Sequence, residues 1–210
     1  MLTLIKREIY DHIAYFIGAL VFSLMTLAIL VFAAYSIDSQ EANAICIIVA
    51  IPIITVFVFG AAGMGVSQMY FDRNKKISAF LSTLPVTRNK ILIARISAGI
   101  LAISIFFLPL IITTWILHPL LALPVPILDN VFYDIYIVGL LMVVACYCIG
   151  LQTGWTTSRI LPSLGGFLLT CILVTIIIVK GLSIQISLLL IIFIIASIIR
   201  VRQKFMSTSF

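Results

Sequence analysis

Long apolar runs recur along this chain, and they determine whether it can fold in water or in a lipid bilayer. No Asp, Glu, Lys or Arg occurs between Asp11 and Asp38, and several later runs are of similar length. About 20 apolar residues in a helix cross the hydrocarbon core of a bilayer with every backbone amide paired inside the helix. A membrane β-barrel would show alternating polar and apolar residues instead. The runs predict six transmembrane helices, over residues 13–35, 44–68, 91–117, 133–156, 160–179 and 182–199.

The composition supports a membrane location. Hydrophobic residues make up 63% of the 210 residues and charged residues 10%, whereas ordinary soluble domains carry about 25% charged residues. The stretch from Ile160 to Ile199 would be about 60 Å long as one helix, so we expect a tight hairpin at Lys180–Ser183 to divide it. The chain is therefore predicted to be one all-α integral membrane domain, residues 1–210, which crosses the cell membrane several times.

The basic residues predict how the chain is oriented. Short cytoplasmic loops retain Lys and Arg, and an N terminus in the cytoplasm places twelve of the thirteen basic residues on that side, with only Lys180 outside. Six spans then return the C terminus to the cytoplasm. Arg95, about one turn inside the third span, can extend its guanidinium to the cytoplasmic surface. This orientation explains the net charge of +6, so we expect a lipid bilayer as a partner and no nucleic acid.

The first twelve residues have the pattern of a short helix. Leu2, Ile5 and Ile9 fall on one helical side, and Lys6 with Arg7 on another. This arrangement suits a helix that lies at the membrane interface. A simple basic flank of the first span would have the same composition and is the alternative.

One polar segment, residues 71–90, separates the second and third expected spans. Six basic residues lie in or beside it, and its apolar residues fall at i, i+3, i+4 and i+7, which is the spacing of one helical face. Pro85 would end such a helix, and Thr87 could cap the start of the next span. We expect a short amphipathic helix that rests on lipid or inserts into a groove on a partner; a solvated connector is the alternative. The apolar face consists of Ile77, Phe80, Leu81 and Leu84.

Residue types that carry chemistry are missing from the places where they would act. No ionisable residue lies near the middle of an expected span, where a proton-coupled carrier or an intramembrane protease would need one. His12 and His118 are expected on opposite sides of the membrane, and the chain has neither a G-x-S-x-G nor a G-x-x-x-x-G-K-[ST] pattern. Cys146 and Cys148 point about 200° apart on a helix, so they cannot share a metal. The chain is predicted to hold no catalytic residue, metal or cofactor.

The end of the polar segment matches a known pattern. Leu84-Pro85-Val86-Thr87-Arg88 is followed by Ile91 and, four residues further, by Arg95. This stretch resembles the end of the coupling helix in the permease subunits of type-2 ATP-binding-cassette (ABC) exporters, which also have six spans and both termini inside. The chain departs from the family pattern at Asp72, where a glutamate is common, and at Lys180–Ser183, where many members carry re-entrant helices.

The resemblance implies partners and contact residues. A separate ATPase subunit, which binds ATP and Mg²⁺, would dock on the coupling helix, and a second permease chain, identical or related, would complete the pathway. The chain would then export a substrate from the cytoplasm or the inner leaflet by alternating access. Two other functions remain open: a membrane scaffold or immunity protein that recruits a soluble partner, and an ion-coupled secondary carrier. The contact residues carried over are Lys75, Ile77, Phe80, Leu81, Leu84, Pro85 and Arg88.

Small and polar residues mark two further places. Gly60, Gly63 and Gly65 close the second expected span, where they would either let helices pack closely or form a flexible wall of the pathway. Gln152 and Thr156 lie at the cytoplasmic end of the fourth expected span. They would either form hydrogen bonds between helices or line a vestibule.

Overall fold

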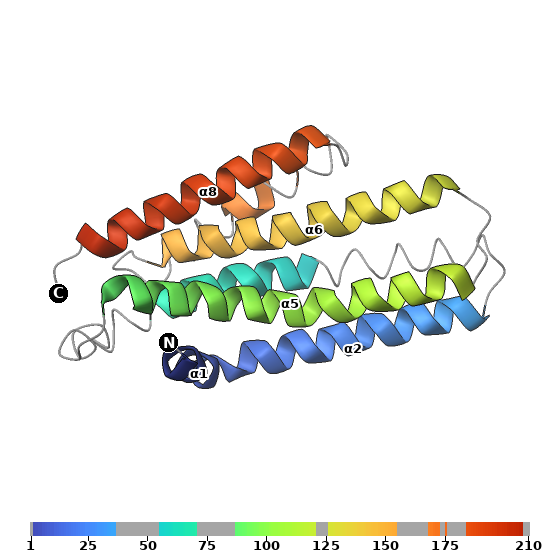
Figure 1. Ribbon diagram of the computed structural model, residues 1–210, viewed down its shortest axis with the longest axis horizontal. Coiled ribbons are helices and arrows are strands. Elements are labelled where there is room, and N and C mark those ends of the chain that lie inside the picture. Colours follow the sequence, from blue (N-terminus) through green and yellow to red (C-terminus); the bar gives the residue numbers. More distant parts are fainter. Residues whose placement is uncertain are drawn as a thin grey trace.

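The protein is built from helices. The computed structural model describes residues 2–36, 55–70, 87–120, 126–154, 168–172, 175 and 184–207, and within these ranges every residue except His12, Thr87 and Gly154 is helical. Residues 55–70 and 168–172 form two helical segments without labels. The described part of the chain is all-α, as the apolar runs predict. The labelled helices are α1 (Leu2–Asp11), α2 (Ile13–Ser36), α5 (Arg88–Leu120), α6 (Pro126–Thr153) and α8 (Ile184–Ser207) (Figure 1).

The central helix of the bundle is α5. It contacts α1, α2, α6 and α8. The axes of the long helices are roughly parallel, with α2 and α5 running one way along the bundle and α6 and α8 running the other way (Figure 1). In the apolar core, Phe106 of α5 stacks on Phe57 of segment 55–70 with ring centres 3.8 Å apart, and Phe107 meets the ring of Phe106 edge-on at 5.2 Å. Phe107 also meets the ring of Phe57 edge-on at 6.3 Å, an arrangement that aromatic rings favour. The contacts of Phe57 with these two rings hold segment 55–70 against α5.

Three helices in the described part of the chain are long and apolar enough to cross a membrane. They comprise Arg88–Ile112 of α5, Tyr136–Thr153 of α6 and Gln185–Ser207 of α8. A fourth would be counted if α1 and residues Ile13–Ile29 of α2 formed one span, although these two pieces meet at 76°. Many Leu and Ile side chains of α2 and α8 are exposed, as expected of helices that face lipid, which is as apolar as the side chains themselves. The protein is therefore a helical membrane protein.

Two helices follow the apolar runs closely. α2 covers the expected span 13–35, and α5 extends the expected span 91–117 by three residues at each end. α5 continues through Pro109 to Leu120, although proline removes a hydrogen bond from a helix.

The bounds of α6 and α8 differ more from expectation. α6 begins seven residues before 133 and ends three before 156. Its first residue is Pro126. Proline is tolerated at the first helical position because the N–H group that it lacks would have no hydrogen-bond partner within the helix there. α8 begins two residues after 182 and continues eight beyond 199. The basic side chains of that extension favour helix and are stabilising near a helix C terminus, so the end of the apolar run does not end α8.

Two expected spans have long stretches outside the described residues. The structure describes residues 55–68 of span 44–68, and residues 168–172 and 175 of span 160–179; all of these are helical. α1 and the end of α8 lie at the same end of the bundle as the start of α5 (Figure 1). That arrangement agrees with both termini lying on one side of a membrane. The count of six spans and the cytoplasmic location of the termini stay predictions.

Candidate functional site

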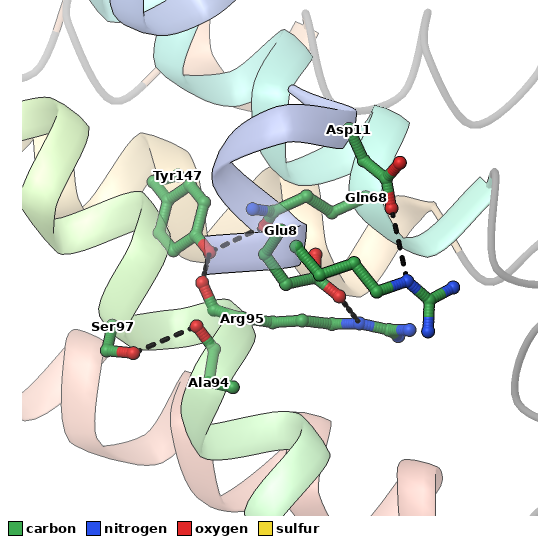
Figure 2. Close-up of polar contacts among 8 residues, drawn as sticks. Glu8, Asp11, Gln68, Ala94, Arg95, Ser97 and Tyr147 are labelled. Carbon is green, nitrogen blue, oxygen red and sulfur yellow. Dashed lines mark hydrogen bonds and ion pairs between the residues drawn. The ribbon is translucent and has the colours of Figure 1, made fainter. Parts of the chain in front are cut away.

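A buried ion pair joins α1 to α5 (Figure 2). Arg95 of α5 has a side chain only 2% exposed, and its Nε donates a hydrogen bond to Oε1 of Glu8 over 3.3 Å. The Glu8 side chain is 12% exposed. The guanidinium carbon also lies 5.8 Å from the centre of the Phe205 ring in α8, within cation–π range. The prediction that Arg95 extends to the membrane surface is therefore wrong, because its charge is compensated inside the protein.

The bend at His12 brings Glu8 to Arg95. α1 and α2 meet there at 76°, so α1 lies across the bundle while α2 runs along α5 (Figure 1). His12 is buried at the bend. Burial lowers the pKa of its imidazole below the usual 6.5, the carboxylate of Asp11 partly opposes this, and the charge of Arg95 lowers the pKa further. A neutral imidazole thus lies close to the buried guanidinium.

The hydroxyl of Tyr147 connects three helices beside the ion pair. Its Oη lies 2.7 Å from Oε1 of Gln68 in segment 55–70 and 3.2 Å from the backbone oxygen of Arg95 (Figure 2). A phenol has one proton to donate, so it can serve only one of these acceptors fully at a time. Nε2 of the buried Gln68 has no hydrogen-bond partner among the described residues. The cluster can therefore adopt two hydrogen-bond arrangements of the same side chains.

The residues of the ion pair and of the Tyr147 hydrogen bonds, together with Phe205, come from five different helical segments, and we call this set the junction. Sequence reasoning had singled out only Arg95. A signal was present, since a basic residue within an apolar span calls for a counter-charge, and Glu8 is one of three acids expected on the cytoplasmic side. No local pattern pointed to the other members. The junction consists of Glu8 (α1), Gln68 (segment 55–70), Arg95 (α5), Tyr147 (α6) and Phe205 (α8).

Glycines let segment 55–70 approach α6 beside the junction. A Cβ added to Gly65 would lie 2.5 Å from the backbone oxygen of Tyr147, and one added to Gly154 would lie 2.7 Å from the oxygen of Val66. Gly150 approaches the same segment even more closely. Backbones can come this near only where side chains are absent. The close approach brings the Tyr147 side chain within reach of segment 55–70.

The other small and polar positions named from the sequence lie away from this contact. A Cβ at Gly60 would have no atom within 4 Å, and one at Gly63 would meet only the Tyr15 hydroxyl, at 3.9 Å. Gln152 is half-buried near the end of α6. Thr156 lies outside the described residues. Of the three glycines, the structure therefore brings Gly65 into tight helix contact.

Most of the expected ATPase contacts also lie outside the described residues. Arg88 is described, as the half-buried first residue of α5. The backbone oxygen of Thr87 accepts hydrogen bonds from the amides of Lys90 and Ile91 at 2.9 and 3.4 Å, as the residue that precedes a helix does. Residues 88–90, expected at the end of the polar segment, therefore belong to α5. The contacts that are not described are Lys75, Ile77, Phe80, Leu81, Leu84 and Pro85.

Metal-binding groups do not gather in the part of the chain that the structure describes. No set of three or more His, Cys, Asp or Glu side chains among those residues could hold a metal ion. Cys146 and Cys148 are both buried in α6. The described chemistry of the junction is that of an ion pair and neutral hydrogen bonds.

These features define a helical membrane protein with a polar junction at one end of its bundle. Comparisons of the chain with protein-family models, with curated proteins and with solved structures give no match. The function is therefore argued from the chain's own residues.

Proposed function

We propose that the chain is the membrane-spanning permease subunit of an ATP-driven exporter of the type-2 ABC class, in the cytoplasmic membrane. The observation that carries this proposal is the position of the junction relative to the polar segment. Gln68 lies two residues before the end of segment 55–70, Arg95 lies seven residues after the start of α5, and Tyr147 contacts both. These are the two helices that the polar segment connects. A displacement of the segment would therefore reach α6 as well.

In the proposed mechanism a separate ATPase subunit binds the polar segment and carries the ATP and Mg²⁺. Only a difference in interaction free energy between two states can shift a conformational equilibrium, so the ATPase must grip the segment differently with and without ATP. The Tyr147 hydroxyl lies within reach of both Gln68 and the Arg95 carbonyl, so a movement of segment 55–70 relative to α5 would strengthen one of these hydrogen bonds and weaken the other. Glu8 and Phe205 extend the same movement to α1 and α8.

The pathway is proposed to form between two permease chains, identical or related. Exposed Leu and Ile side chains on α2 and α8 leave apolar surface for lipid or for a second chain. The substrate would leave the cytoplasm or the inner leaflet as the two chains alternate between inward-facing and outward-facing forms. The resemblance of the polar segment to a coupling helix supports this arrangement.

The test is to disable the apolar face of the polar segment. The double variant Phe80→Asp/Leu84→Asp should lose the ATPase subunit on purification in mild detergent, and lose ATP hydrolysis in the same sample, because charged side chains cannot enter an apolar groove. The matched control is Ala79→Asp/Ser82→Asp, which places the same two charges on the opposite side of the expected helix. Equal loss, or equal retention, in both double variants would contradict the proposal.

The same preparation separates the proposal from the two other functions. A stable native complex without any ATPase would favour a scaffold that recruits a different soluble partner. Transport that follows an ion gradient and ignores ATP would favour a secondary carrier.

A further inference from the structure

α1 has four sides of different chemistry. Successive residues of a helix are about 100° apart, so Leu4 and Glu8 share one side. Leu4 packs against the core and Glu8 pairs with Arg95, so this is the inner side of α1. The remaining sides are an outer side with Leu2, Lys6 and Tyr10, an apolar flank with Ile5 and Ile9, and a polar flank with Arg7 and Asp11.

The outer side exposes apolar surface and charge together. Leu2 is 83% exposed and Tyr10 64%. Lys6 is exposed between them, with its Nζ 6.0 Å from the centre of the Tyr10 ring. Aromatic rings with a polar tip and lysines with a long apolar stem both suit the boundary between lipid and water, where one end of the side chain is apolar and the other is wet. The outer side of α1 therefore fits a lipid headgroup layer better than water.

Among the described residues, basic side chains outnumber acidic ones at this end of the bundle. The two acids of α1 are already paired, Glu8 with Arg95 and Asp11 with Arg7. α5 begins and α8 ends at the same end of the bundle as α1 (Figure 1). Neither of those two helix ends contains an acid. Charge complementarity thus selects an anionic surface. The basic residues at the two helix ends are Arg88, Lys90, Arg200, Arg202 and Lys204.

We propose that α1 binds anionic phospholipid, with its outer side in the headgroup layer and Lys6 paired to a lipid phosphate. Leu2 and Tyr10 enter the boundary with the acyl chains on either side of Lys6. The buried pair of Glu8 and Arg95 holds the helix in the orientation that presents this side. One lysine near an anionic surface strengthens the preference for anionic lipid about five-fold. This inference needs neither an ATPase nor transport.

The test measures which lipid lies next to α1 in the purified full-length chain, by the quenching of a tryptophan placed on that helix. Tyr10→Trp is introduced after the native Trp115 and Trp155 are replaced by Phe, and the protein is reconstituted with brominated phosphatidylglycerol or brominated phosphatidylcholine, which quench nearby tryptophan. We expect phosphatidylglycerol to be preferred about five-fold at this position. Adding Lys6→Gln should remove most of this preference, because Nζ of Lys6 lies 6.0 Å from the ring at residue 10, whereas Lys204→Gln at the end of α8 should lower it less.

A second reporter, Ile17→Trp on the exposed side of α2, is the matched control and should be quenched equally by both lipids. The proposal is overturned if the reporter at residue 10 is quenched by aqueous iodide and by neither lipid, or if Lys6→Gln lowers the preference no more than Lys204→Gln does. If the tryptophan-free chain does not insert, a nitroxide at Tyr10→Cys, compared with the labelled native chain, gives the same readout from lipid-soluble and water-soluble relaxants. Failure here leaves the proposed transport function standing, since no partner subunit is present.

Discussion

Removal of the Glu8 carboxylate should destabilise the protein far more than removal of a comparable carboxylate from the surface of the same helix. Glu8→Leu leaves Arg95 with a side chain 2% exposed and a guanidinium that cannot lose its proton. Removing one partner of a buried ion pair costs about 3–5 kcal/mol. The control is Asp11→Ala, which breaks an ion pair with Arg7 of 3.6 Å whose side chains are 53% and 38% exposed. Exposed pairs of this kind contribute about 0–1 kcal/mol.

The pair also predicts an asymmetry and a rescue. Arg95→Met leaves a carboxylate that can take up a proton, so this variant should lose less stability than Glu8→Leu. The double variant Glu8→Leu/Arg95→Met replaces both charges by apolar side chains, and such replacements are often neutral. It should therefore regain most of the stability that Glu8→Leu loses.

The assay is equilibrium unfolding in mixed micelles of a mild detergent and dodecyl sulfate, followed by circular dichroism, for the native chain and all four variants. The free energies of unfolding give the coupling between the two positions directly. Two results would refute the reasoning. One is a loss in Glu8→Leu no larger than in Asp11→Ala, and the other is a double variant that loses the sum of its single variants.

Four further variants test the packing, hydrogen bonding and protonation near this pair by the same unfolding measurement, one of them as a control. Tyr147→Phe removes the hydroxyl that lies between two buried acceptors, Gln68 and the Arg95 carbonyl, and should cost about 1–3 kcal/mol; an unchanged free energy of unfolding would contradict these hydrogen bonds. Gly150→Ala drives a methyl group into the backbone of segment 55–70 and should cost about 1–3 kcal/mol, whereas Gly60→Ala, with no atom within 4 Å of the new Cβ, should be neutral or stabilising. His12 has a lowered pKa, so its neutral form contributes stability that is complete above pH 6.5 and is lost as the pH falls below it. His12→Gln should therefore lose less stability than the native chain on acidification, with Asp11 and Arg95 as the charged groups that act on this residue.

The helices could largely be predicted from the sequence, because the membrane imposes a length and a polarity that are visible residue by residue. α2 and α5 follow their apolar runs closely. The ends of α6 and α8 could not be read in this way, since helix formation depends on backbone propensity and capping as well as hydrophobicity. Arg200 ends an apolar run but not a helix.

The junction could not be predicted, because it is made of contacts between distant parts of the chain. Because Arg95 is about one turn from the end of its expected span, its side chain was expected to reach water. The bend at His12 instead places the Glu8 carboxylate beside it inside the protein. Gly60 and Gly65 have similar sequence surroundings. They differ in the structure because the backbone of α6 packs against Gly65, whereas no atom lies within 4 Å of a Cβ added to Gly60. The spacing of apolar residues in the sequence shows which side of a helix is buried, but it does not show which other segment packs against that side.

The pair of Glu8 and Arg95 also bears on the order in which the protein is made. The two residues are 87 positions apart, and a ribosome delivers α1 to the membrane well before α5 is complete. Glu8 is therefore synthesised before Arg95, whereas Tyr147 and Phe205 are synthesised after it. Because Glu8 is synthesised before Arg95, its carboxylate is available to pair with the guanidinium as α5 inserts.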